Sequence, residues 1–170
     1  MEKTLDYSGF EDETIIITEK DTWGMEDYIS FMKEKYIQKN IPKRKNGIPA
    51  FVHPLFVFDS LRGLNRTIRI SALYHDVIED GVLNEEELWI LPQKARKIVL
   101  LLTRKNKTPY LLYIFRICFN KEATIIKIAD IQENMSDGYA SFKKQYILYP
   151  LAEMILRIAF HFHFPLFKIK

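Results

Sequence analysis

The sequence predicts a single all-α domain. Apolar residues recur at helical spacing along most of the 170-residue chain. Hydrophobic residues make up 48% of the chain and aromatic residues 14%, which is enough for a packed core. Only residues 14–18 (Thr-Ile-Ile-Ile-Thr) are typical of a strand, and so short a segment does not set the fold. We therefore expect a helical bundle.

The first two helices are expected before residue 65. Apolar residues spaced three and four apart predict a helix over residues 25–36. Pro54 suits the first turn of a second helix that reaches about Leu61, because a helix leaves its first N–H groups unpaired. Gly63 is expected to end this helix.

The third helix carries much of the polar chemistry described below. Asn65 can cap its start, and the apolar pattern continues through Val77 to Gly81, where we expect it to stop. Asn84 and Glu87 have the spacing of a capping box, which predicts a short helix directly after this stop.

Four further helices are expected in the second half of the chain. They cover residues 92–102, a segment that opens at Thr108-Pro109 and carries Leu112 and Phe115, residues 121–135, and about 141–160. The C-terminal segment, residues 161–165 (His-Phe-His-Phe-Pro), alternates polar and aromatic residues. We expect a packed or dimer-forming tail there, so a homo-oligomer is a candidate assembly.

Charge is distributed unevenly along the chain. The net charge is +3, yet residues 1–27 hold nine acids and two lysines. We expect residues 1–24 to form an irregular acidic N-terminal extension and residues 25–170 to form the single domain. Basic residues cluster at 39–45 and 104–107, and such clusters attract anions. They form no long basic stripe, so nucleic acid is not an expected partner.

The sequence indicates a cytoplasmic protein. Cys118 is the single cysteine, so no intrachain disulfide can form. The N-terminus is acidic and polar, unlike a signal peptide. Charged residues or proline interrupt every long apolar stretch, so we expect no membrane-spanning segment.

Four short segments bring imidazoles and carboxylates into apolar, helix-like surroundings. They are Phe51-Val52-His53-Pro54, Tyr74-His75-Asp76, Glu79-Asp80 and Lys127-Ile128-Ala129-Asp130. Burying such groups is costly unless they are paired or bind a metal. A divalent metal site between helices is therefore expected, with spare carboxylates to accept a proton from an attacking water. This chemistry predicts hydrolysis of a phosphate ester.

The expected third helix concentrates these groups. Residues four apart share a helix face, which would stack His75 with Glu79 and Asp76 with Asp80. Asp130 follows an almost wholly apolar run, so its carboxylate is expected to be paired, to cap a helix or to bind metal. Two imidazoles and two carboxylates suit manganese, iron or zinc.

Three stretches of the sequence resemble the HD-domain phosphohydrolases, and most closely the hydrolase domain of the RelA/SpoT alarmone enzymes and their small stand-alone relatives. The stretches are residues 44–54 (Arg-Lys-Asn-Gly-Ile-Pro-Ala-Phe-Val-His-Pro), residues 72–80 (Ala-Leu-Tyr-His-Asp-Val-Ile-Glu-Asp) and residues 127–135 (Lys-Ile-Ala-Asp-Ile-Gln-Glu-Asn-Met). The resemblance covers roughly residues 25–160 and implies an HD-domain helical bundle.

The resemblance also implies a role for particular residues. It implies a metal, most often manganese, held by His53, His75, Asp76 and Asp130. Glu79 and Asp80 would act on the attacking water. The expected contacts to a guanine nucleotide are Arg44, Lys45 and Asn46, with Asn134 at its sugar. Apart from the resemblance, the charge of Lys107 in the second basic cluster makes it an expected contact to the phosphates. In that family, the reaction removes the 3′-pyrophosphate of guanosine tetra- or pentaphosphate.

Two other functions stay open from the sequence. One is an HD-type phosphatase acting on another nucleotide or deoxynucleotide, and the other is a non-catalytic module that binds a nucleotide or a partner protein. The intact Glu79-Asp80 pair argues against a binding module, which would not need it. Residues 44–47 (Arg-Lys-Asn-Gly) favour the alarmone hydrolase over the general phosphatase.

Overall fold

The protein is all-helical over the residues that the computed structural model describes, which are 23–44, 47–136 and 144–163. The helices in chain order are α2 (Met25–Gln38), α3 (Val52–Ser60), α4 (Arg66–Leu73), the 3₁₀ helix η1 (Glu86–Ile90), α5 (Gln93–Leu102), α6 (Tyr110–Ile117), α7 (Lys121–Ser136), the π-helix η2 (Lys144–Leu148) and α8 (Tyr149–His163). The expected all-α class is confirmed.

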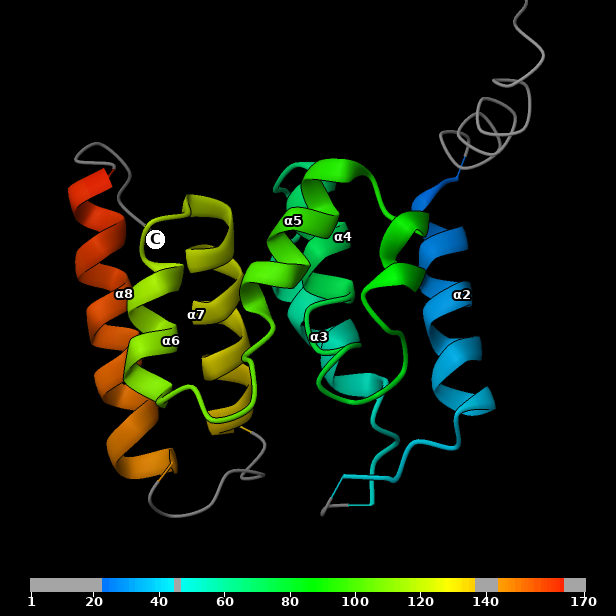
Figure 1. The fold of residues 1–170 in the computed structure, drawn as a ribbon, viewed down its shortest axis with the longest axis horizontal. Coiled ribbons are helices and arrows are strands. Elements are labelled where there is room, and N and C mark those ends of the chain that lie inside the picture. Colours follow the sequence, from blue (N-terminus) through cyan, green and yellow to red (C-terminus); the bar gives the residue numbers. More distant parts are fainter. Residues whose placement is uncertain (1–22, 45–46, 137–143, 164–170) are drawn as a thin grey trace, which may run out of the picture.

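Helix α7 joins the two halves of the bundle. Figure 1 shows α6, α7 and α8 grouped at one end, α2 at the other, and α3, α4 and α5 between them. Helix α7 packs against α8 on one side and against α3, α4 and α5 on the other. Side chains from α7 that face α3 and α4 therefore lie inside the molecule, where any polar group needs a partner.

Several helix ends follow the expected capping chemistry. The Asn65 side chain accepts a hydrogen bond from the Ile68 N–H at 3.0 Å, which caps α4. Asn84 and Glu87 each accept from the other's main-chain N–H at 2.8 Å, so the predicted capping box is confirmed at η1. Pro54 lies in the first turn of α3.

The prediction that the third helix continues to Gly81 is wrong. Helix α4 ends at Leu73, and residues 74–81 form successive turns. The His75 ring takes the Ala72 carbonyl as its hydrogen-bond partner (Nδ1 to O, 2.8 Å), in place of the main-chain N–H that would continue the helix. Gly81 ends the turns with φ +71°, a conformation that glycine adopts without strain. The polar groups of this segment therefore lie on turns rather than on one helix face.

Other predictions concern residues at the edges of the described structure. The strand-like residues 14–18, most of the acidic extension 1–24, and the end of the C-terminal tail lie outside the described residues. The division at residue 24 stays a prediction.

The buried face of α6 differs from the residues singled out in the sequence. In α6, Leu112 and Phe115 are exposed, and Tyr113, Ile114 and Ile117 form the buried face. No helix of the described chain is both long and apolar enough to cross a membrane.

Candidate metal centre and its cavities

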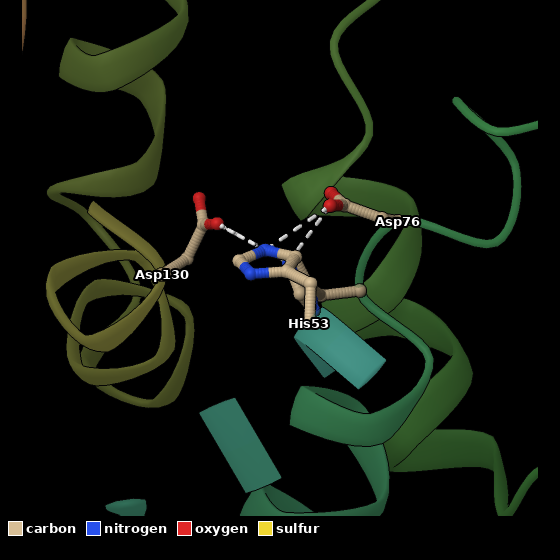
Figure 2. Close-up of side chains that lie close together, drawn as sticks. His53, Asp76 and Asp130 are labelled. Carbon is tan, nitrogen blue, oxygen red and sulfur yellow. Dashed lines mark hydrogen bonds and ion pairs between the residues drawn. The ribbon is translucent and has the colours of Figure 1, made fainter. Parts of the chain in front are cut away.

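Four side chains from three parts of the chain meet beside α7. His53 comes from the first turn of α3, and His75 and Asp76 come from the turn that follows α4. Asp130 comes from the middle of α7. Figure 2 shows Asp76 and Asp130 reaching the His53 ring from opposite sides. Within the described residues, these four form the one group of three or more His, Cys, Asp or Glu residues that could hold a metal ion.

The spacing of these side chains suits a single ion. His53 Nε2 lies 2.9 Å from Asp130 Oδ1, and His75 Nε2 lies 3.1 Å from Asp76 Oδ2. One nitrogen or oxygen atom from each residue lies within 4.8 Å of the other three. Since ligand bonds to a divalent ion are about 2.1 Å long, opposite ligands lie about 4.2 Å apart. The four atoms therefore fit around one ion with small side-chain adjustments.

The His75 ring is oriented as a metal ligand. Its Nδ1 donates to the Ala72 carbonyl, so Nε2 faces the centre and would offer its lone pair to an ion once the ring is neutral. This Nε2 is buried and has no well-aligned hydrogen bond, although Asp76 Oδ2 is at ion-pair distance. A buried ring nitrogen facing two carboxylates without a satisfied hydrogen bond fits an ion better than it fits a closed polar network.

The charges of the centre depend on one another. Burial alone would lower the pKa of His75, but the adjacent Asp76 and Asp130 outweigh burial and hold that pKa well above its ordinary value. Burial alone would raise the pKa of Asp130, but Lys127 and the two histidines hold it well below the ordinary range. His75 also lowers the pKa of Asp76 against the effect of burial. Without an ion, His75 is therefore an imidazolium between two carboxylates.

This charge state predicts how metal affinity depends on pH. An ion must displace the proton that His75 holds, so the affinity should rise by roughly tenfold per pH unit below the raised pKa of His75. About one proton should be released per ion bound. Titration calorimetry with Mn²⁺ in buffers of different ionisation enthalpy measures both quantities. A pH-independent affinity between pH 6 and 8 would contradict this assignment.

A buried lysine that the sequence analysis did not single out supports the centre. Lys127 Nζ lies 2.6 Å from Asp130 Oδ2, one turn away on α7, and its side chain is 13% exposed. Burial alone lowers the pKa of Lys127, but Asp130 outweighs it and keeps the lysine charged. One Asp130 oxygen thus faces Lys127 and the other faces the histidines. The available signal was a lysine inside an apolar helix, three residues before an aspartate.

Two cavities open beside the centre, and both are lined by Asp76, Asp80 and Asn134. The first has a volume of about 330 Å³. Its other lining residues are three cations (Arg104, Lys127 and Lys144), three tyrosines (Tyr110, Tyr113 and Tyr149), Glu79, Asp130 and Leu148. The second, of about 280 Å³, reaches Lys43 and Arg44 on the other side. Each of the two cavities beside the centre therefore combines basic side chains with the carboxylates of the centre and its neighbours.

Glu79 and Asp80 both line the first cavity, and each is held by a residue distant in sequence. The Arg104 main-chain N–H donates to Glu79 Oε1 at 2.7 Å, and the Tyr36 hydroxyl donates to Asp80 Oδ2 at 2.8 Å. Burial and the nearby Asp76 raise the pKa of Asp80 to about 6. Burial also raises the pKa of Glu79. Both carboxyls are therefore poised to exchange protons closer to neutral pH than ordinary carboxyls are.

Arg44 and Asn134, two of the expected nucleotide contacts, meet at the edge of the centre. Arg44 Nη2 donates to Asn134 Oδ1 at 2.9 Å, and Asn134 Nδ2 donates to Asp130 Oδ1 at 2.6 Å. Lys107 lines neither cavity, whereas Arg104 and Lys144, which were not expected there, line the first. Lys45 and Asn46 lie outside the described residues.

The fold and the centre define an all-α protein with the HD-domain architecture and a buried histidine–aspartate cluster that could bind metal. The fold matches a solved metazoan ortholog of SpoT, described as a protein that hydrolyzes ppGpp and plays a role in starvation responses. The TM-score is 0.64 at 18% sequence identity, and the match covers 85% of this chain and 97% of that one. No protein-family model and no curated protein matches the sequence.

Proposed function

We propose that this protein is a metal-dependent phosphohydrolase that removes the 3′-pyrophosphate from guanosine tetra- or pentaphosphate, with manganese as its cofactor. The observation that carries the proposal is the cluster of His53, His75, Asp76 and Asp130 beside two cavities that each contain basic side chains. The fold match to a protein that hydrolyzes ppGpp supports the choice of substrate.

The four clustered side chains would hold the ion. Two imidazole nitrogens and two carboxylate oxygens form a borderline-to-hard donor set, which suits Mn²⁺. A bound divalent ion lowers the pKa of water and polarises phosphoryl oxygens. The residues around the centre would accept the proton of the attacking water and hold the phosphates.

Asp80 and Glu79 would receive the proton of the attacking water. Asp80 lines both cavities next to Asp76, so its carboxylate faces the space beside the ion. A general base works best when its pKa is near the working pH, and the pKa of Asp80 is raised to about 6. Glu79 lines the first cavity only, which makes Asp80 the better-placed proton acceptor.

The basic residues would hold the phosphates at both ends of the nucleotide. Arg104 and Lys144 line the first cavity, and Lys43 and Arg44 line the second. Guanosine tetraphosphate carries a diphosphate on each side of its sugar, so it presents negative charge to both cavities. Fixed cations would stabilise the negative charge that develops on the phosphoryl oxygens and on the ribose 3′-oxygen of GDP as water attacks the phosphorus and the bond between phosphorus and that oxygen breaks.

Replacing the two carboxyls should separate catalysis from metal binding. Asp80→Asn and Glu79→Gln should keep the fold and the ion, because neither residue belongs to the four-residue cluster. Turnover should fall by about 10²-fold in Asp80→Asn and by less in Glu79→Gln. Metal content is measured by elemental analysis and turnover by steady-state kinetics. Loss of metal in both variants would reassign the two residues as ligands.

The substrate is tested by chromatography of products under Mn²⁺. Guanosine tetraphosphate, GTP, dGTP and dAMP are incubated separately with the purified protein. We expect the tetraphosphate to yield GDP and pyrophosphate, with the other three unchanged. Survival of the tetraphosphate while another nucleotide is consumed would favour a general nucleotide phosphohydrolase. No turnover of any of the four would leave only the binding module.

Arg44 should contribute to substrate binding more than to the chemical step. Arg44→Ala should raise KM by about 10-fold with a smaller change in kcat, because a contact to the bound nucleotide is shared by the ground and transition states. Arg62→Ala is the matched control, since Arg62 is an exposed arginine that pairs with Asp59. A fall in kcat at unchanged KM would instead place Arg44 at the reacting phosphorus.

A further inference from the structure

A single side chain holds the Asp80 carboxylate. Tyr36 lies in the last turn of α2, and its hydroxyl donates a hydrogen bond to Asp80 Oδ2 at 2.8 Å. The two residues are 44 positions apart in the sequence. Within the described part of the chain, no other side chain hydrogen-bonds this carboxylate. Its second oxygen, Oδ1, is therefore available to a water or a substrate in the cavities that Asp80 lines.

Asp80 needs a tether because no helix fixes it. It lies on the turns after α4, where its N–H donates to the Asp76 carbonyl at 2.8 Å. A solvent-accessible side chain on such a turn samples several rotamers. A hydroxyl from a packed helix selects the rotamer that it can reach. Glu79 has its own tie, to the Arg104 main-chain N–H, so Tyr36 acts on Asp80 alone.

Tyr36 is itself rigidly placed. Its side chain is 2% exposed and packs with Tyr28 and Met32, which lie on the same face of α2. Burial, followed by the charges of Asp80 and Asp76, raises the pKa of Tyr36 far above its ordinary value. The hydroxyl therefore keeps its proton and remains a donor. A second tyrosine joins α2 to the same turns, because Tyr74 donates to the Tyr28 carbonyl at 2.8 Å.

We propose that Tyr36 is a positioning residue that orients the Asp80 carboxylate toward the attacking water, so that α2 takes part in catalysis through this one hydrogen bond. The inference rests on the proposed role of Asp80 as proton acceptor. Tyr36 lines neither of the two cavities, so it would act only through its hydrogen bond to the Asp80 carboxylate.

The test compares two tyrosine-to-phenylalanine variants. Tyr36→Phe and Tyr74→Phe each remove one buried hydroxyl from the same core cluster. The Tyr74 hydroxyl bonds a main-chain carbonyl, so Tyr74→Phe reports the structural cost alone. In Tyr36→Phe, kcat for the substrate found in the nucleotide panel should fall roughly 10-fold, with KM and the Mn²⁺ dissociation constant unchanged. Tyr74→Phe should lose similar stability and keep its kcat.

A double-mutant cycle separates this inference from the proposed function. In the Asp80→Asn background, Tyr36→Phe should lower kcat no further, because its target is gone. Wild-type kcat in Asp80→Asn would refute the role of Asp80 as proton acceptor, and the inference with it, whereas the nucleotide panel tests the proposed function separately. A low kcat in Asp80→Asn with wild-type kcat in Tyr36→Phe would refute only the inference, as would equal losses in the two tyrosine variants. The free energies of unfolding of the same proteins in urea test the Tyr36–Asp80 contact without measuring turnover. If the losses in Tyr36→Phe and Asp80→Asn simply add in the double variant, the two side chains do not interact and the inference fails.

Discussion

Replacing His75 or Asp130 by alanine is expected to lower the affinity for Mn²⁺ by at least about 100-fold and to abolish turnover. Changes to groups that only support a metal ligand cost 10–100-fold in affinity, so loss of a ligand should cost at least as much. Each residue contributes one atom to the four-residue cluster. Elemental analysis and Mn²⁺ titration of the purified variants measure the effect.

The control for this experiment is a solvent-exposed carboxylate on α3, the helix that also carries His53. Asp59 lies near the end of α3, pairs with the exposed Arg62, and its side chain is 57% exposed. Asp59→Ala should therefore bind Mn²⁺ like the unchanged protein. Circular dichroism confirms that each variant is folded before its metal content is read. Unchanged metal in both His75→Ala and Asp130→Ala would refute the centre.

Lys127→Met is expected to destabilise the metal-free protein by about 3 kcal/mol, because it removes the lysine cation from a carboxylate that stays buried. Asp130 is 4% exposed at its side chain and loses its 2.6 Å partner. Methionine keeps most of the lysine's length and apolar contacts, so the loss is chiefly electrostatic. Urea unfolding in the presence of a chelator measures the change. Added Mn²⁺ should recover part of it, since the ion also stabilises the Asp130 charge.

A second lysine provides the matched comparison. Lys94 pairs with Glu122 at 2.8 Å, but its side chain is 64% exposed. Lys94→Met should change the free energy of unfolding by no more than about 1 kcal/mol, as is typical of surface ion pairs. Equal effects of Lys94→Met and Lys127→Met would show that burial gives the Lys127–Asp130 pair no special weight.

The helical fold was largely predictable because its signals are local. Capping by Asn65 and the Asn84–Glu87 box depends on residues within one turn, and each was found as expected. The end of α4 was not predictable in this way. The apolar spacing continues to Val77, but the His75 ring competes for the Ala72 carbonyl once the core places it there. Such competition depends on packing, which apolar spacing does not report.

The electrostatic support of the centre also lay beyond sequence patterns. Lys127 could be noticed as a charge in an apolar helix, but its partner oxygen on Asp130 depends on side-chain directions. Tyr36 left no local signal, because 44 residues separate it from Asp80. Lys107 was expected near the phosphates from its place in a basic cluster, whereas Arg104 and Lys144 line the cavity.

The sequence by itself determined the all-α class, most helix boundaries and the four residues of the candidate centre. Helical periodicity, caps and polar residues within apolar segments can all be recognised from residues that are close together in the sequence. Only the tertiary structure decided which atoms face one another. It placed the Asp80 carboxylate against the Tyr36 hydroxyl, the Glu79 carboxylate against the Arg104 N–H, and the centre beside two cavities that each contain basic side chains. Those contacts join residues distant along the chain, and they form only when the helices pack and water leaves the space between them.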